Sequence, residues 1–211
     1  LRTRDGSATG VLLDSGEVVD ARYVVSAGDL GHMLDWMRDA GIPSRRHELA
    51  RTVLRPGRAV AQVSLGVRSA CEESELSRRL DADEPESLVI CPSRTGADRA
   101  ARAPAHRVTV RQYRRDPGLA PEGCRVITCQ VETDYAYWAR FATDRPAYLA
   151  AKQSFAGEVI GLLERIWPGL AACVEVVDVA TPLTTERYTS NAVGSVHGVR
   201  PDRVGFAFPV P

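Results

Sequence analysis

The sequence predicts an α/β or α+β fold. We expect a mixed, largely antiparallel sheet with helices on one side. Two patterns predict it. Residues 146–167 carry apolar side chains at steps of three and four, which indicates one long helix with an apolar face. Short apolar or alternating segments, typical of strands, lie at 60–67, 88–91, 107–113, 124–132 and 174–179. Because 44% of the residues are hydrophobic, we expect the helix to bury its apolar face against this sheet.

The long helix has sequence signals at both ends. Asp144 is a suitable N-cap, and Pro146 fits the first helical turn. Pro168-Gly169 ends the helix. A group of aromatic residues precedes it, and we expect this group either to pack in the core or to line an apolar pocket. Its members are Tyr135, Tyr137, Trp138 and Phe141.

In the N-terminal part of the chain, the sequence predicts three short strands within residues 9–27, followed by a helix. Asp14-Ser15-Gly16 indicates a tight turn, and the apolar run Tyr23–Ser26 is the third expected strand. Asp29 can cap a helix from Leu30 to about Ala40. Whether Asp29 only caps this helix or also lies near a cofactor is open at this point. Further polar helical segments are expected at 44–52 and within 71–85.

Composition narrows the functional classes. Basic and acidic residues number 27 each, so charge gives no reason to expect nucleic acid as a partner. No apolar run reaches the roughly 18 residues of a membrane span, and we expect no signal peptide. The five cysteines and four histidines lack the spacing of a zinc site, so we expect no metal. Free, mostly structural thiols indicate a reducing, cytoplasmic compartment.

The stretch 175–198 is the least generic part of the chain. It opens as a strand, which Pro182 stops because proline has no N–H to donate to a ladder. A hydroxyl-rich polar run follows, closed by Gly194 and Gly198, so its main chain can approach a ligand closely. The plain alternative is a surface loop without a function.

This stretch resembles the segment after the long helix in the phytoene desaturase and carotenoid isomerase family, which belongs to the flavin amine oxidase superfamily. The matching positions are Thr181-Pro-Leu-Thr184, Glu186–Tyr188, Gly194-Ser195 and Gly198.

Two other stretches carry the same resemblance. One is the hairpin Gly10–Gly16 with the strand that ends in Ser26-Ala27-Gly28-Asp29, where Gly28 departs from the family pattern. The other is the loop Asp116–Gly123, with two prolines and two glycines. The resemblance covers nearly the whole chain and is weakest at 71–106.

The resemblance implies an FAD-dependent oxidoreductase that desaturates or isomerises an apolar isoprenoid or polyene. It places Ser26, Ala27, Gly28 and Asp29 near the cofactor. It places Arg187, Tyr188 and His197 at the substrate pocket, although each of these also fits a purely structural or surface role. It identifies no catalytic residue, because in such enzymes the flavin carries the chemistry. Peripheral membrane contact is left open, since such substrates dissolve in lipid.

The resemblance also implies a division of the chain into three parts. Residues 1–43 would be a remnant of the FAD-binding domain, 44–180 the substrate-binding domain, and 181–211 a segment that returns to the FAD domain. The Gly-x-Gly-x-x-Gly turn that holds the FAD pyrophosphate is not in the sequence. We therefore expect an internal fragment that is inactive alone, with FAD bound mainly by parts outside it.

Two alternatives remain from the sequence. One is a flavin-free module that binds a lipid or isoprenoid, and the other is a partner-interaction domain of the same fold. A glycine-rich dinucleotide turn elsewhere in the reading frame would favour the enzyme. Its absence would favour the module.

Overall fold

The computed structural model describes residues 1–42, 55–68, 86–91, 107–113 and 118–198. The chain divides into two compact units, each considered by itself below. One unit joins Leu1–Arg58 with Thr185–Pro211, and the other is Ala59–Thr184. The predicted helical segments at 44–52 and within 71–85 lie outside the described residues, as does the start of the loop 116–123.

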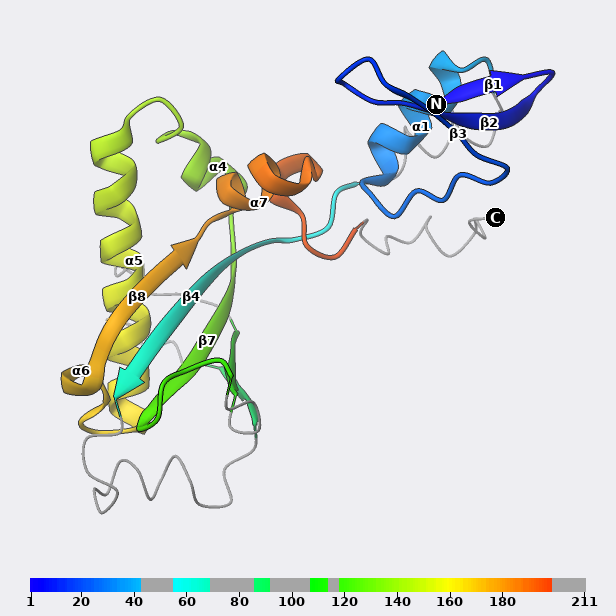
Figure 1. The fold of residues 1–211 in the computed structure, drawn as a ribbon. Helices are drawn as coiled ribbons and strands as arrows, with labels where there is room; N and C mark the ends of the chain where they lie inside the picture. Colours follow the sequence, from blue (N-terminus) through cyan, green and yellow to red (C-terminus); the bar gives the residue numbers. More distant parts are fainter. Residues whose placement is uncertain (43–54, 69–85, 92–106, 114–117, 199–211) are drawn as a thin grey trace. The chain divides into compact units, whose positions relative to one another are not determined.

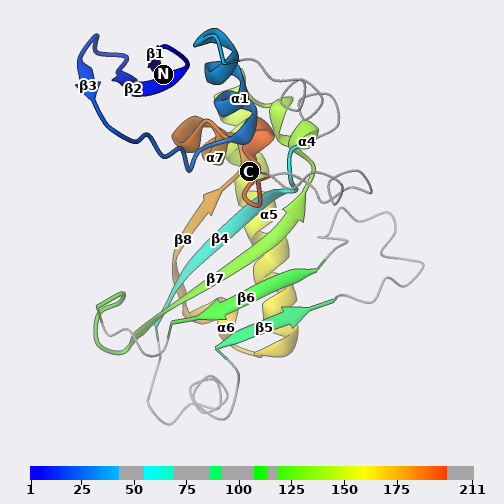
Figure 2. The same cartoon turned by 90° about the vertical axis from the view of Figure 1, so that its right-hand side faces the viewer.

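The unit Ala59–Thr184 contains a five-stranded sheet in the order β5-β6-β7-β4-β8, seen face-on in Figure 2. Its described strand pairings are all antiparallel. The strands are β4 (Ala59–Arg68), β5 (Ser87–Ile90), β6 (Val108–Gln112), β7 (Cys124–Thr133) and β8 (Val174–Ala180). Each lies within one or two residues of a predicted strand. The predicted fold class, helices with largely antiparallel sheets, is confirmed.

Helix α5 (Arg145–Ile166) covers one face of this sheet (Figures 1 and 2). Asp144 caps it by accepting a hydrogen bond from Ala147 N at 3.0 Å, as predicted. Its buried residues pack against the alternate residues of β4, β6 and β7, because successive strand side chains point to opposite faces. The fully buried members of this core include Val63, Val108, Cys129, Val159, Leu163 and Leu170. The short helix α6 (Leu170–Cys173) leads from α5 into β8.

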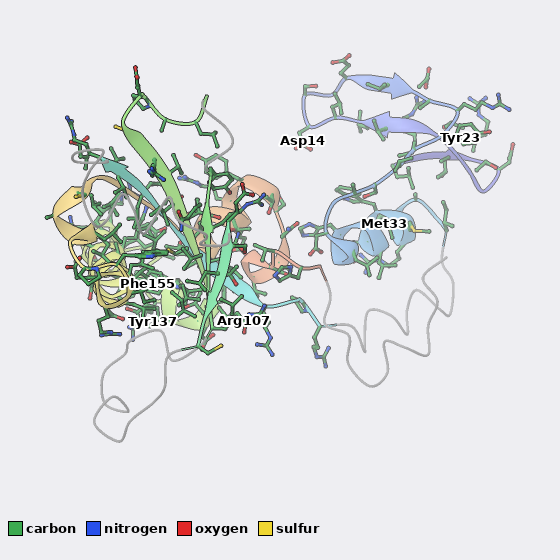
Figure 3. The ribbon with its side chains drawn as sticks, turned by 90° about the horizontal axis from the view of Figure 1, so that it is seen from below. Asp14, Tyr23, Met33, Arg107, Tyr137 and Phe155 are labelled. Atoms are coloured by element: carbon green, nitrogen blue, oxygen red, sulfur yellow. The ribbon has the colours of Figure 1, made fainter. Side chains whose placement is uncertain are left out.

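Three of the four aromatic residues before α5 belong to a second core cluster: Tyr137, Trp138 and Phe141. Trp138, on helix α4 (Tyr135–Ala139), is fully buried, and its Nε1 donates to Thr133 Oγ1 at 3.0 Å. Its ring meets those of Tyr137 and Phe155 edge to face, at centroid distances of 5.1 and 5.5 Å. Figure 3 shows Tyr137 and Phe155 among densely packed side chains. Of the two predicted roles, the structure supports core packing for these three residues, while Tyr135 is half-buried and outside the cluster.

The expected polar loop after Pro182 is instead a helix, α7 (Pro182–Thr189). Thr181 precedes it, with its N–H donating to Thr184 Oγ1 at 3.2 Å while Thr184 N donates to the Thr181 carbonyl at 2.9 Å. This reciprocal pairing stabilises a helix start, and proline suits the first helical position. The loop prediction was wrong because hydroxyl residues favour both loops and helix starts.

The unit Leu1–Arg58 with Thr185–Pro211 contains a small antiparallel sheet in the order β1-β2-β3. Its strands are β1 (Arg2–Arg4), β2 (Ser7–Leu12) and β3 (Val18–Asp20). The predicted turn joins β2 to β3, and Gly16 has φ +84° there. Helix α1 (Leu30–Asp39) follows, close to its predicted bounds.

The third predicted strand, Tyr23–Ser26, is not formed. Val25 is 90% exposed, and within the described residues no hydrogen bond joins the main chain of 22–28 to another segment. β-Branched residues favour a strand only where a neighbouring edge accepts its hydrogen bonds. Among the described residues, this segment pairs with no strand edge.

Candidate functional site

Asp29 joins two segments that are far apart in the sequence. Its Oδ1 accepts hydrogen bonds from Gly31 N at 2.8 Å and His32 N at 3.2 Å, which caps α1. Its Oδ2 accepts a third, from Ala192 N at 3.3 Å. Ala192 begins the short 3₁₀ helix η1 (Ala192–Gly194), so the carboxylate ties the start of α1 to the returning segment. The two roles that the sequence left open for Asp29 both include capping α1, which the structure confirms. The structure adds the hydrogen bond to Ala192.

The returning segment closes on Gly57. Gly57 N donates to the Gly198 carbonyl at 2.6 Å, and Ser195 Oγ donates to the same oxygen at 2.9 Å. A Cβ atom on Gly57 would lie 2.8 Å from both acceptor and hydroxyl oxygens, so no larger residue fits. Val193 has φ +52°, a strained value for a β-branched residue. The sequence argument used Gly194 and Gly198 but missed Gly57, since the dipeptide Pro56-Gly57 by itself indicates only a turn.

The predicted substrate-pocket residues lie on the surface of this unit. Arg187 and Tyr188 are exposed on α7, where the guanidinium lies 4.7 Å from the centre of the Tyr188 ring. His197 is exposed in the bend before Gly198. No described contact joins the histidine to the other two residues. The structure therefore does not assemble these three residues into one pocket.

The four residues predicted to lie near FAD do not form a phosphate cradle by themselves. A helix N-terminus can bind phosphate when its N–H groups are free. At α1, however, the N–H groups of Gly31 and His32 already bind Asp29. Ser26, Ala27 and Gly28 are exposed and offer only main-chain groups and one hydroxyl. The described residues thus do not fit the pyrophosphate of FAD, and they leave Ser26–Gly28 free to contact the edge of a ligand.

The sheet of the other unit presents a second surface with chemical character, which we call the polar face. It is the face of β4–β8 turned away from α5, and strand alternation places the non-core residues there. Gln130 Nε2 donates to Gln62 Oε1 at 3.1 Å, and Gln62 Nε2 donates to Ser64 Oγ at 3.2 Å. The sequence predicted the strands that carry this face, but the face itself was not predicted. The pairing that gathers these residues needed the strand register.

Besides Arg68, whose pKa is raised by its hydrogen bond to and the charge of Glu175, two groups in the unit Ala59–Thr184 have perturbed pKa values with structural causes. Burial raises the pKa of the Cys129 thiol to about 12, so this cysteine is an inert part of the core. The main-chain N–H groups of Ala171 and Gly169 lower the pKa of the Glu164 carboxyl. Glu164 thereby holds the turn between α5 and α6. Neither group has the surroundings of a catalytic acid or nucleophile.

A hydroxyl cluster in the same unit explains the Thr-Pro-Leu-Thr motif. The Tyr148 hydroxyl lies 2.7 Å from Thr181 Oγ1 and 3.3 Å from Thr184 Oγ1. Thr181 is fully buried, so its hydroxyl requires such a partner. The motif joins the first turn of α5 to the start of α7, which is a structural role.

No protein-family model matches this sequence, and no curated protein matches it. Within the described ranges, no group of three or more His, Cys, Asp and Glu side chains is arranged to hold a metal ion. The helices described in the structure are all too short or too polar to cross a membrane.

Proposed function

We propose that the chain is the substrate-binding middle part of an FAD-dependent oxidoreductase that desaturates or isomerises an isoprenoid or polyene-type substrate. One observation carries the proposal. The chain leaves one unit after Arg58, builds a complete sheet-and-helix unit, and returns to the first unit at Thr185. Such an order is that of one unit inserted into another, and the sequence resemblance implies an inserted substrate-binding domain. The observed boundaries differ from the predicted 43/44 and 180/181, and the assignment of the units to flavin and substrate domains stays a prediction.

The local structure supports this proposal at two places. Asp29, in the stretch that resembles the edge of a flavin domain, binds Ala192 in the returning segment. The inserted unit has one sheet face covered by α5 and a second face that can meet a ligand. When bound, the flavin would supply the hydride or electron chemistry, and polypeptide outside these 211 residues would hold its pyrophosphate.

The absorption spectrum of the complete encoded protein tests the proposal. We expect the bands of bound oxidised flavin, together with a Gly-x-Gly-x-x-Gly strand–helix turn elsewhere in the reading frame. Replacement of the first two glycines of that turn by alanine should abolish the bands. A complete protein that lacks both the turn and the bands would refute the proposal.

The flavin-free binding module remains the second candidate. It is favoured by the engagement of Asp29, because its carboxylate already binds the N–H groups of Gly31 and His32 that a phosphate would use. This candidate predicts a colourless complete protein that still binds a polyene. A spectrum with flavin bands would exclude it.

A further inference from the structure

Five polar residues, one from each strand, form a continuous row across the polar face. Ser64 on β4 pairs with Asp178 on β8 and with Thr128 on β7. Thr128 in turn pairs with Arg111 on β6, and Arg111 with Ser87 on β5. The strand spacing of about 4.8 Å places Asp178 about 14 Å from Arg111 along this row. That separation exceeds the Debye length at physiological salt, about 8 Å, so Asp178 hardly offsets the positive charge of Arg111.

Arg111 is a cation without a described acidic partner. No ion pair or hydrogen bond of its guanidinium is present among the described residues, and the group stacks 5.1 Å from the centre of the Tyr113 ring. By contrast, Arg68 on β4, which is separated from β6 by β7, forms an ion pair with Glu175. Hydroxyl groups surround Arg111: Thr128 and Ser87 beside it and Thr109 two residues earlier on the same strand. The Thr109 and Thr128 side chains are half-buried and have no described hydrogen-bond partner.

An apolar row lies next to the polar one. Val176 on β8 pairs with Gly66 on β4, which pairs with Val126 on β7. A Cβ atom on Gly66 would lie 3.1 Å from Val176 Cβ, so the valine side chain lies against the bare glycine backbone. Val176 is nonetheless 61% exposed. The polar face therefore offers a cation with hydroxyl donors on one row and exposed apolar surface on the next.

We propose that the polar face binds an elongated apolar molecule that carries a carboxylate, with the carboxylate at Arg111 and the chain along Val126 and Val176. A guanidinium flanked by hydroxyl donors complements a carboxylate in both charge and geometry. A pure hydrocarbon on this face would remove water from Arg111 and the threonine hydroxyls without replacing its hydrogen bonds, which is unfavourable. The identification of this molecule as the substrate rests on the proposed function, which it narrows from an apolar polyene to a polyene acid.

Binding of cis-parinaric acid, a fluorescent polyene acid, to the complete protein tests this inference, with its uncharged methyl ester as the comparison probe. We expect the acid to bind more tightly than the ester. Arg111→Gln should weaken the binding of the acid about tenfold, because one charge-assisted hydrogen bond is lost. It should leave the affinity for the ester unchanged. Arg165→Gln is the matched control, because Arg165 is exposed on α5, on the opposite side of the sheet. It should change neither probe.

A second variant, Thr128→Val, keeps the side-chain shape and removes one hydroxyl beside Arg111. It should weaken the binding of the acid severalfold and change the binding of the ester little. Equal affinities for acid and ester, or equal effects of Arg111→Gln and Arg165→Gln, would overturn the site, and so would no binding of the acid. The outcome is separable from the proposed function. A colourless protein with Arg111-dependent acid binding keeps the site and refutes the enzyme, whereas a flavoprotein that binds only the ester does the reverse.

Discussion

The replacement of Gln112 by methionine should stabilise the unit Ala59–Thr184. Gln112 ends β6 on the same side as Val108 and Val110, which pack in the core against α5. Its side chain is 4% exposed, and neither its Oε1 nor its Nε2 has a hydrogen-bond partner in the part of the chain that the structure describes. Its main-chain N–H donates to the Glu86 carbonyl at 2.8 Å and is unaffected by the substitution.

The expected gain follows from the unpaired amide. A buried polar group without a partner costs about 1–3 kcal/mol, and methionine removes this penalty at nearly the same volume. The change of side-chain shape in a packed core costs up to about 1.5 kcal/mol, so we expect the free energy of unfolding to rise by about 1 kcal/mol in total. For a chain of this length that gain corresponds to a rise in Tm of about 2–4 °C.

Urea and thermal unfolding followed by tryptophan fluorescence measure this gain, because Trp138 and Trp167 lie in the core of the same unit. Gln130→Met is the matched control. Gln130 lies on the adjacent strand but is exposed on the opposite face and hydrogen-bonded to Gln62. Its replacement should give no gain. A loss of stability in Gln112→Met would show that the amide has a partner, such as an internal water molecule, and would refute the reasoning.

Three further predictions concern other parts of the chain. Asp29→Ala should destabilise its unit by about 1–2 kcal/mol in urea unfolding, since it removes the α1 cap and the Ala192 contact, and Asp29→Asn should recover part of the loss. Tyr148→Phe should cost about 1 kcal/mol, because it leaves the buried Thr181 hydroxyl without its closest partner, and a neutral result would contradict that role. The Cys129 thiol has its pKa raised by burial from 9.0 to about 12, so the unfolded chain loses this proton first. The protonated Cys129 thiol therefore contributes fully to the free energy of unfolding below about pH 9, and this contribution is lost as the pH rises toward 12. A Cys129→Ala variant with the same alkaline loss of stability would contradict this assignment.

The strands of the larger unit and its long helix could be predicted closely because their signals are local. The alternation in β4 and the three- and four-residue steps in α5 come from burial of one face, which leaves a period in the sequence. Asp144 and Asp29 were likewise recognisable as caps, since a cap bonds N–H groups only two or three residues away.

The candidate sites were less predictable because they depend on contacts between distant segments. Asp29 could be named from the sequence, but its bond to Ala192, 163 residues later, could not. Arg187, Tyr188 and His197 were grouped by resemblance, and no described contact joins His197 to the other two. The row around Arg111 was missed altogether, since its five members lie on five strands and only the strand register aligns them.

Local patterning thus specified which residues become strands and helices and which of their faces turn inward, because hydrophobic burial acts on neighbouring positions with a fixed period. Strand pairing decided the rest. It left Tyr23–Ser26 outside any described sheet, although its residues favour a strand, because a strand exists only where an edge accepts its hydrogen bonds. The same pairing placed the hydroxyls of Thr128 and Ser87 beside Arg111, since register across a sheet depends on the mutual fit of segments far apart in the chain.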